Sequence, residues 1–581
     1  MKTIRKIACL ILCLAFFVPA LASCGKSEET PVATTAPAST DPAASEPEGT
    51  APETEATTAA ATTDKWEKLA GKVTMLSARD RQLKIELSEK YTPEKASRND
   101  IYVKGPDVVE DGVTPRIQQM VYERNKAAYD VLQTTVEYVF WDYAWGTQGR
   151  QIEQVVKGND PDAPDLFVNM FYDLGKAALN ALLMDVWSIP GSFFDFDTEG
   201  WLSAWMQSMS FTGDRAYILG SDYFLDLMRA INVLPFNMTM MDANAAKLAD
   251  AIIGADDDPL GTGEKLSTRF FDLVDEGNWT WDVLGKLCEA IWVDLDGDGV
   301  DSIRDQLGIT ADEGGGANAS TFIYSCGADV TTERYKIEDP ESPYNGQWWI
   351  KYHDTSENLN RIFDAVQSVF LGAGTLGTDA KQEGNSPDQP GIAYLRTKFA
   401  AGETLFAGIN TLSGLEDDAF QTMEDLYSVV PCPTVDAGVG YHTVMDYTGD
   451  AGAINVNIGP RKVKTLTAFI QYCTERSPAI RTQFLQIVTK YKTTIYNQGT
   501  DRMLEIIYDG ILYERDKMVD DMVMAGGGRH EDRWHVLLKK DDYCGAGSDY
   551  IAQQYEALRP SKQAILDNLM KKWYTLPKAG D

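Results

Sequence analysis

The sequence has few cysteines for its length, and those it has form no pattern. Eight cysteines occur among 581 residues, and three of them lie within the first 24. The remaining five stand alone, with no Cys-x-x-Cys pair: Cys288, Cys326, Cys432, Cys473 and Cys544. An odd number of scattered cysteines argues against a disulfide framework and against a structural zinc site. We therefore expect isolated buried thiols.

Positive charge is also scarce. The chain has 53 lysines and arginines against 87 aspartates and glutamates, which gives a formal net charge of -34 at pH 7. Nucleic-acid binding relies on basic contacts to phosphate, so this balance argues against DNA or RNA as a partner. It also disfavours a strongly anionic ligand, and for a surface protein it favours solubility.

The motifs of several enzyme classes are missing. The sequence contains no Gly-x-Ser-x-Gly elbow and no Walker loop. His530 and His535 are separated by five positions, which on a helix turns their rings about 140° apart, so they cannot share one zinc ion. Residues 372–377 match Gly-x-Gly-x-x-Gly, but a helical pattern precedes them and a polar segment follows, so we interpret them as a turn. We expect no catalytic residues and no enzymatic activity.

Long apolar runs are confined to the N-terminus. Basic residues at positions 2, 5 and 6 precede an apolar segment, and Leu-Ala-Ser-Cys follows at 21–24. This order is typical of a secretory signal peptide, which we predict over residues 1–23. The last four residues resemble a bacterial lipobox, which implies a lipid on Cys24; the alternative is an ordinary signal peptide with a chance cysteine. Because no later stretch of about 18 apolar residues occurs, we expect a chain anchored at the extracellular face of the cell membrane and not threaded through it.

Residues 24–64 lack the side chains that build a core. Between Gly25 and Asp64 there is no aromatic residue, leucine or isoleucine, and Thr, Ala, Pro, Ser and Glu dominate. Such a segment buries too little apolar surface to offset the entropy of ordering it. We predict a disordered tether that follows the lipidated cysteine.

The rest of the chain is globular in composition and begins with an α/β pattern. We predict strands at 73–76, 136–141 and 165–168, and helices at 117–132 and 148–157, from their period-2 and helical spacing. Alternating strands and helices indicate an open α/β sheet. Ligands of such sheets bind beyond the carboxyl ends of the strands. Further on, Thr280 is a predicted N-cap, and from position 464 the pattern is mainly helical.

One acidic loop has the spacing of a calcium site. Residues 294–305 read DLDGDGVDSIRD, with oxygen-bearing side chains at loop positions 1, 3, 5, 9 and 12 and a glycine at position 6. We predict a structural Ca²⁺ ion, because a hard cation takes six to eight oxygens and one tight loop supplies them here. The alternative is an acidic turn without metal. The predicted ligands are Asp294, Asp296, Asp298, the carbonyl of Val300, Ser302 and Asp305.

Several segments together resemble a known family. Residues 231–237 (INVLPFN) are similar to the crossover strand of extracellular solute-binding proteins of the maltose-binding type (family 1 of the ABC importers). Residues 274–282 (VDEGNWTWD), 427–433 (YSVVPCP) and 503–509 (MLEIIYD) resemble their helix start, strand end and C-terminal helix. The PCPTVDAG segment departs from the family's PYPKxDxxQ.

The resemblance implies a two-lobed, periplasmic-binding-protein-like (type II) α/β fold with hinge-crossing strands and a helical C-terminal part. It divides the mature chain into lobe 1 over 65–225, lobe 2 over 226–436 with the calcium-type loop, and a return to lobe 1 with C-terminal helices over 437–581. It also implies a ligand cleft between the lobes and an ABC permease in the membrane as partner. We therefore expect a lipoprotein that captures a solute, with an oligosaccharide favoured and peptides left open.

Candidate ligand-binding residues come from strand ends, the crossover and aromatic pairs. An indole ring suits the apolar face of a sugar, and Asp or Asn suits its hydroxyl rim. For any one Trp, core packing is an equally good interpretation. The candidates are Trp141, Asp142, Tyr172, Asp222, Tyr223, Trp348, Trp349 and Asp446. Two alternatives remain: a surface glycoside hydrolase, which would need two facing carboxylates, and a carbohydrate-binding adhesin without a transporter.

Overall fold

The fold is described from a computed structural model. It describes residues 65–89, 99–142, 147–254, 260–312, 317–327, 329–378, 385–386, 389–446, 448–493, 498–512 and 547–577. All of them belong to one compact unit, Thr62–Asp581. The predicted signal peptide, lipidated cysteine and tether lie outside the described residues, as do His530, His535 and Cys544. Among the described helices, none is long and apolar enough to cross a membrane.

The first sheet has four strands in the order β14-β3-β1-β2. Their bounds are β1 (Gln82–Glu89), β2 (Thr135–Asp142), β3 (Leu166–Met170) and β14 (Asp450–Ile454). β1 is parallel to β2 and β3, whereas β14 arrives from far along the chain and pairs antiparallel with β3. Every residue of β3 and β14 is buried, as expected for strands that helices cover on both faces. The carboxyl ends of β1, β2 and β3 therefore lie along one edge of the sheet.

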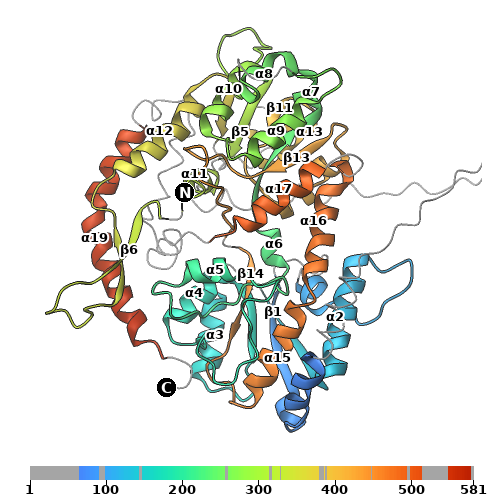
Figure 1. The fold of residues 1–581 in the computed structure, drawn as a ribbon, viewed down its shortest axis with the longest axis vertical. Coiled ribbons are helices and arrows are strands. Elements are labelled where there is room, and N and C mark those ends of the chain that lie inside the picture. The colour runs from blue at the N-terminus through green and yellow to red at the C-terminus, as the bar shows by residue number, and fades with distance from the viewer. Residues whose placement is uncertain are drawn as a thin grey trace, which may run out of the picture. The chain divides into compact units, whose positions relative to one another are not determined.

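Lobe 1 is this sheet with the helices around it (Figure 1). The residues 65–74 are helical, and Trp66 is buried, with its ring edge against Tyr472. The other elements are η1 (Arg79–Arg81), η2 (Asp100–Lys104), α2 (Arg116–Leu132), α3 (Gln148–Lys157), α4 (Phe171–Leu179), α5 (Ser203–Met209) and α15 (Lys462–Thr474). α15 is almost wholly buried and contacts both α2 and β1.

The second sheet has the order β12-β4-β11-β5-β8, with β13 also paired to β4. The bounds are β4 (Asn232–Asn237), β5 (Leu307–Asp312), β8 (Thr375–Thr378), β11 (Thr404–Phe406), β12 (Asn410–Thr411) and β13 (Tyr427–Val430). β11, β5 and β8 run parallel to one another. β4 is antiparallel to its neighbours β11, β12 and β13.

Lobe 2 is the second sheet with its own helices. These are α7 (Met238–Ala243), α8 (Ala245–Ile252), α9 (Leu266–Asp275), α10 (Trp281–Ile291), α11 (Ala317–Tyr324), α12 (Glu357–Leu371), α13 (Ile392–Ala400), η4 (Leu412–Glu416) and α14 (Asp418–Thr422). Two short strands, β9 (Asn385–Ser386) and β10 (Gln389–Pro390), pair with each other. Thr280 caps α10, because its side chain accepts a hydrogen bond from the Val283 amide as predicted.

Trp279 is the centre of the lobe 2 core. Its side chain is fully buried and lies edge-on to Phe270 and stacked on Phe406. Its Nε1 donates to the carbonyl of Pro431 at 3.0 Å, and its backbone carbonyl accepts from the Thr434 amide at 3.1 Å. This tryptophan of the EGNWTWD segment therefore ties the core of lobe 2 to the chain that leaves the lobe.

Within the described residues the chain crosses between the lobes four times, the last time along the helix α19 (Gly547–Thr575). It enters lobe 2 through α6 (Asp226–Arg229) and β4, and it returns from β13 to β14. These two crossings pair with each other: the Asn232 amide donates to the Val444 carbonyl at 3.1 Å, and the Asp446 amide donates to the Ala230 carbonyl at 2.7 Å. The third crossing leads from α15 to α16 (Pro478–Thr493) and α17 (Gln498–Asp509), and α17 lies on α9 and β13.

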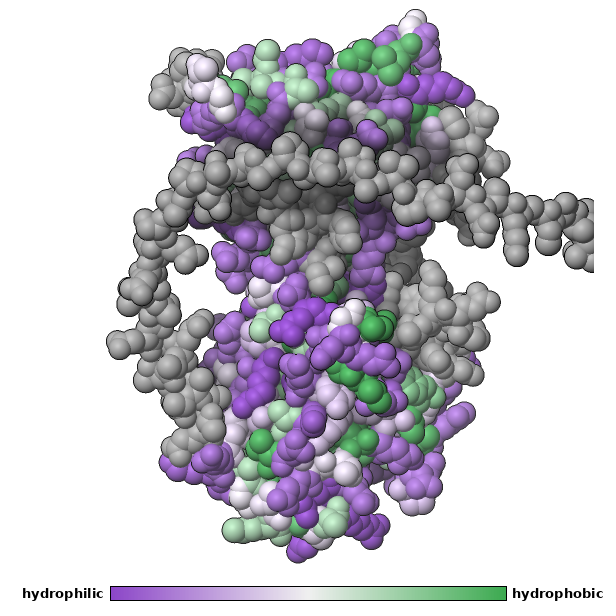
Figure 2. Space-filling model, turned by 90° about the vertical axis from the view of Figure 1, so that its right-hand side faces the viewer, coloured by the Kyte–Doolittle hydropathy of each residue, from purple (hydrophilic) through white to green (hydrophobic). Residues whose placement is uncertain are grey.

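A hairpin and a long helix complete the fold. The hairpin joins β6 (Thr332–Lys336) to β7 (Trp348–Tyr352), and the helix is α19 (Gly547–Thr575). α19 packs along β7 and α12, and in Figure 1 it runs down the left margin beside both. The face shown in Figure 2 is mainly hydrophilic, with hydrophobic residues in small separate groups among its coloured atoms. Such scattered apolar residues are ordinary for a protein surface.

The described cysteines are reduced thiols. Cys288, Cys432 and Cys473 are buried and Cys326 is half-buried, and none forms a disulfide. Burial raises the pKa of Cys432 and of Cys473 to about 12. Both side chains therefore remain neutral thiols, which are poor nucleophiles.

Most of the predicted elements are confirmed, with one clear error. The predicted strand at 73–76 is wrong, because 65–74 is helical and the first strand is β1 at 82–89. The sequence of β1, QLKIELSE, alternates polar and apolar residues in the manner of a half-exposed strand. Its polar Glu86 and Ser88 are nevertheless buried beneath neighbouring elements. The two-lobed α/β fold with crossing strands and a helical C-terminal part is confirmed.

Candidate functional site

A hollow of about 620 Å³ lies where lobe 1 faces the helices of the third crossing. One wall is the lobe 1 segment 199–201, and the others are the starts and faces of α16 and α17. The lining combines apolar, aromatic and hydrogen-bonding side chains: Glu199, Trp201, Arg481, Thr482, Leu485, Gln486, Asp501, Leu504, Glu505, Tyr508 and Asp509, with Gly200. A concave site with a few convergent polar groups is the usual form of a small-molecule site.

Asp222 holds the walls of this hollow together. Its carboxylate is fully buried and accepts from Arg481 Nη1 at 2.6 Å and from Tyr508 Oη at 3.1 Å. The Arg481 guanidinium also lies 4.1 Å from the centre of the Tyr508 ring. Lobe 1 therefore contributes an acid that positions side chains of both α16 and α17.

Burial and ion pairing shift the pKa of Asp222 in opposite directions. Burial raises the pKa of the Asp222 carboxyl to about 7, although the Arg481 cation and the Tyr508 hydroxyl each lower it. Burial lowers the pKa of the Arg481 guanidinium, but Asp222, Tyr508 and Glu199 together raise it above its ordinary value. The arrangement is thus a partly buried ion pair in which the pKa of the carboxyl group lies near neutral pH.

The hollow offers many hydrogen-bond acceptors and little positive charge. Four carboxylates line it, at Glu199, Asp501, Glu505 and Asp509, and all four residues are exposed. Arg481 is the single cation among the lining residues, and it is engaged with Asp222 and, at 3.4 Å, with Glu199. Carboxylates accept hydrogen bonds and do not donate them when ionised. The site therefore suits a ligand rich in hydroxyl or amino donors.

Of the predicted ligand-binding residues, the structure brings Asp222 into contact with the lining of this hollow. Its neighbour Tyr223 is fully buried in lobe 1, beneath the guanidinium of Arg124 at 4.7 Å. Asp446 lies on the returning crossing, where its Oδ1 accepts from the Thr448 amide. Asp446 therefore orders the crossing itself, and it precedes the returning strand β14.

The strand-end residues lie where the pattern placed them. Trp141 is near the end of β2, half-buried against Phe167, and Tyr172 is in the first turn of α4, directly after β3. The Lys176 ammonium group lies over the Tyr172 ring, with Nζ 3.6 Å from the ring centre. Asp142 ends β2, and its side chain lies outside the described residues.

The Trp348 and Trp349 pair belongs to the hairpin, apart from the hollow. Trp349 is buried, its Nε1 donates to Asp567 of α19 at 3.0 Å, and its ring stacks on Tyr574. Trp348 lies beneath the cations of Arg334 and Lys336. The Trp349 indole thus packs the hairpin onto α19, whereas the Trp348 indole is engaged within the hairpin by cations of β6.

Sequence reasoning did not single out Arg481, Tyr508 or Glu505. Arg481 and Tyr508 are 259 and 286 positions from Asp222, and no local motif marks them. The predicted helix at 503–509 held the one available signal, because Glu505, Tyr508 and Asp509 are three to four residues apart and share one face.

The acidic loop 294–305 is folded as a tight turn. Carboxylate oxygens of Asp294, Asp296 and Asp305 lie within 4.8 Å of one another. Asp294 also accepts from the Gly297 and Gly299 amides, and the loop ends are joined by a pair of backbone hydrogen bonds between Val293 and Gln306.

The remaining predicted ligands of the loop are less convergent. Asp298 Oδ1 accepts from the Val300 amide at 2.8 Å, and Ser302 Oγ donates to Asp296 at 3.4 Å. The buried Asp305 carboxylate accepts from the Leu295 and Ser302 amides. Three carboxylates with oxygens held this close fit a hard divalent cation such as Ca²⁺.

Residues 372–377 follow α12 and lead into β8, as a turn. This is the reverse of the strand-then-helix order that a dinucleotide site needs. Gly374 has a φ of +76°, and an added Cβ would lie 2.2 Å from the Cys288 carbonyl oxygen. The glycine is needed for this close approach to α10.

No protein-family model matches the sequence, and no curated protein matches it. Solved structures with similar folds include UspC of M. tuberculosis, at 12% identity and a TM-score of 0.46, over 83% of this chain and 100% of that one. The GacH receptor of Streptomyces glaucescens GLA.O is 11% identical, with a TM-score of 0.44 over 83% and 98%. A cyclo/maltodextrin-binding protein complexed with maltotetraose is 14% identical, with a TM-score of 0.43 over 86% and 98%. By its own strand order and crossings, the chain is a two-lobed α/β protein of the periplasmic-binding-protein-like fold.

Proposed function

We propose that this protein binds a solute, most readily an oligosaccharide, in the hollow between lobe 1 and α16–α17, and delivers it to an ABC importer. The observation that carries the proposal is the Asp222–Arg481–Tyr508 arrangement, in which lobe 1 and both crossing helices meet at one hollow. A change in the relative position of the lobes would open or close this hollow, which is the usual way in which two-lobed binding proteins capture ligands.

The chemistry of the lining favours a neutral or amino-bearing sugar. Trp201 and Tyr508 offer ring faces, although the Trp201 ring is largely buried and its Nε1 donates to Gln471 at 3.0 Å. The exposed carboxylates would accept hydrogen bonds from several hydroxyl groups. An anionic ligand would meet four acids and one already paired cation. The maltotetraose named for one of the similar structures is consistent with this preference.

A thermal-unfolding screen of residues 65–581 against neutral oligosaccharides, amino sugars, uronic-acid oligomers and peptides tests the proposal. A ligand present at 100 times its Kd should stabilise the protein by about 2.7 kcal/mol. Chromatography of the same samples shows whether the ligand is intact. A saturable shift with intact ligand supports a binding protein, whereas consumption of the ligand would favour a glycoside hydrolase. No shift with any of these solutes would contradict the proposal.

Glu505→Gln should weaken binding of the ligand found in this screen about tenfold, because a hydrogen bond to a charged group contributes about 1.5–3 kcal/mol. Glu505 is exposed on the face of α17 that lines the hollow. The matched control is Glu153→Gln on α3, far from the lining, which should leave the Kd unchanged. Isothermal titration calorimetry gives both values, and equal affinities for the two variants would remove the hollow from consideration.

The lipid anchor is part of the same proposal. The signal-peptide pattern, the lipobox-like LASC segment and the tether composition support attachment through Cys24 at the outer face of the cell membrane. Replacing the cysteine, Cys24→Ala, should move the protein from the membrane fraction to the medium. Metabolic labelling with a fatty-acid analogue should mark the unchanged chain and not the variant.

We also propose that Ca²⁺ binds the loop 294–305 and stabilises lobe 2. The three convergent carboxylates support this role, because without a cation they repel one another. Ca²⁺ at 100 times its Kd should raise the free energy of unfolding by about 2.7 kcal/mol. Asp294→Asn should abolish the gain, whereas Glu289→Gln on the exposed face of α10 should not. Unfolding curves with Ca²⁺ and with chelator that superimpose would show that the loop is an acidic turn.

A further inference from the structure

α19 is bound to lobe 2 along most of its length. Tyr555 is buried, and its hydroxyl donates to the carbonyls of Thr331 at 3.1 Å and His353 at 2.8 Å, at the base of the hairpin. Further along, Gln563 Oε1 accepts from the Tyr352 amide at 2.8 Å. With 29 residues the helix is about 43 Å long, which is enough for its last turns to reach beyond lobe 2.

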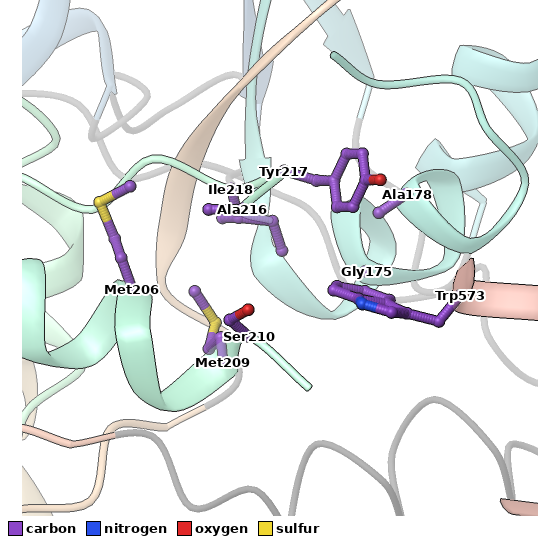
Figure 3. Close-up of a pocket in the computed structure, with 9 residues that line it drawn as sticks. All are labelled: Gly175, Ala178, Met206, Met209, Ser210, Ala216, Tyr217, Ile218 and Trp573. Atoms are coloured by element: carbon purple, nitrogen blue, oxygen red, sulfur yellow. The ribbon is translucent and has the colours of Figure 1, made fainter. Parts of the chain in front are cut away.

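The last turn of α19 is seated in lobe 1. The Trp573 side chain is 3% exposed and lies against lobe 1, where it lines a small pocket together with α4, α5 and the segment 210–218 (Figure 3). Its ring lies edge-on to Tyr217 at 5.4 Å and near Phe211 at 4.7 Å, and its Nε1 donates to Thr212 Oγ1 at 2.8 Å. Lobe 1 therefore provides both the aromatic contacts of this indole ring and the acceptor for its N–H group. The residues of lobe 1 that line the pocket are Gly175, Ala178, Met206, Met209, Ser210, Ala216, Tyr217 and Ile218.

Arg215 of lobe 1 holds the end of the helix electrostatically. The residue is buried, and its Nη1 donates to the carbonyls of Trp573 at 3.0 Å and Leu576 at 2.8 Å. Carbonyls at the end of a helix lack partners within the helix and carry partial negative charge, so a guanidinium there is favourable. At the surface, Lys572 Nζ donates to Asn180 Oδ1 at 3.0 Å.

The hairpin reaches lobe 1 at the same place. Tyr574 of α19 donates to the Trp348 carbonyl at 2.7 Å. The Arg334 guanidinium of β6 lies beside Gly213, where an added Cβ would be 3.0 Å from Nη1. Together, the hairpin and α19 form a second link between the lobes, which we call the strap.

The strap and the crossing segments are separate connections. The crossings pair at Ala230–Asn232 with Val444–Asp446, whereas the strap meets lobe 1 at α4, α5 and 210–218. In Figure 1, α19 is at the left margin and α16 is to the right of centre. A rotation of the lobes about the crossings would change the distance between the lobes at the strap. Because a packed helix resists stretching, the strap opposes such a rotation.

We propose that the strap is a latch: while Trp573 is seated in lobe 1, the lobes are held at one separation, and release of this end of α19 permits them to move. The inference goes beyond solute binding and does not depend on the identity of any ligand. It assigns Trp573 and Arg215 the role of positioning one lobe against the other.

Distances between the lobes of the ligand-free protein test the latch. Spin labels are attached through genetically encoded ketone residues at Gln154 on α3 and Asp272 on α9, both exposed, which avoids the native thiols. Pulsed electron–electron double resonance should give one narrow distance distribution for the otherwise unchanged chain. Trp573→Ala should broaden the distribution and shift its mean, and Arg215→Met should do so to a smaller extent.

Lys571→Ala is the matched control, because this exposed residue is two positions from Trp573 on the same helix. It should leave the distance distribution unchanged. Amide exchange in the last two turns of α19 should rise on the order of 100-fold in Trp573→Ala, as expected when a buried indole no longer holds a helix end.

Release of the helix end, seen by amide exchange, with an unchanged distance distribution would overturn the proposal, since lobe separation would not depend on the strap. If Trp573→Ala fails to fold, Arg215→Met decides the question, because it keeps the indole and removes the two bonds to the helix carbonyls. A narrow, unshifted distribution for that variant, with its last turn released, would equally refute the latch.

Discussion

Arg481→Met should destabilise the protein by about 3–5 kcal/mol above neutral pH, because removing one partner of a buried ion pair leaves the other charge buried alone. Arg481 donates to the fully buried Asp222 at 2.6 Å, and Tyr508 supplies the other hydrogen bond of that carboxylate. Methionine keeps most of the apolar stem while it removes the charge. The measurement is urea-induced unfolding at pH 8, followed by circular dichroism.

The loss should be smaller at pH 5. A carboxyl with a pKa raised to about 7 in the folded protein favours folding in its neutral form, and that contribution fades as the pH rises from about 4 toward 7. Arg481 lowers the pKa of Asp222, so without Arg481 this carboxyl stays neutral up to a higher pH. The loss of folding stability in the variant is therefore largest above neutral pH, where the buried carboxyl must ionise without its partner. Asp222→Asn combined with Arg481→Met should recover much of the stability at pH 8. An equal loss at both pH values would show that the ion pair is not the cause.

Trp279→Ala should cost about 3–5 kcal/mol through the cavity left in the core, and in addition it leaves the Pro431 carbonyl without the indole donor. The ring is fully buried between Phe270 and Phe406. We expect cooperative unfolding at a lower urea concentration, with Ca²⁺ present throughout to keep the loop 294–305 in one state.

Trp279→Phe separates the two contributions. Phenylalanine preserves much of the ring packing and removes the hydrogen bond to Pro431, so its cost should be near 1–2 kcal/mol. A loss for Trp279→Ala no greater than that for Trp279→Phe would mean that the core repacks around the smaller side chain. Such a result would place the importance of this tryptophan in its hydrogen bond to the outgoing chain.

Local patterns predicted the elements whose periodicity is strong. The helices at α2 and α3 and the strands at β2 and β3 agree with their spacing, and Thr280 caps α10 as its position indicated. β1 was missed although its polar and apolar residues alternate, and the burial of its polar Glu86 and Ser88 depends on contacts that only the fold creates. Asn169 Nδ2, for example, donates to Glu86 at 3.3 Å from a strand 83 positions away.

The candidate site was harder to predict than the fold, for a physical reason. Asp222 was found because it precedes the crossover, but its partners Arg481 and Tyr508 come from helices that reach it only after two lobes have formed. The tryptophan pair of the hairpin shows the opposite failure. Trp348 and Trp349 have the composition of a sugar platform, yet the α19 helix that covers Trp349 lies more than 190 positions later in the chain.

The order of the crossings has a mechanical consequence. The first described residues dock on lobe 1, where Lys65 Nζ contacts Glu475, the C-cap of α15, at 2.9 Å. The last described helix also ends in lobe 1, at Trp573 and Leu576. Lobe 2 is therefore an insertion that holds neither end of this unit. A load applied through either end reaches lobe 1 directly, and it reaches lobe 2 only through the crossings and the strap. If the chain is held at a membrane by its N-terminal side, lobe 1 is the fixed body. Lobe 2 is then the part that moves by thermal motion relative to lobe 1 and to any solute bound between them.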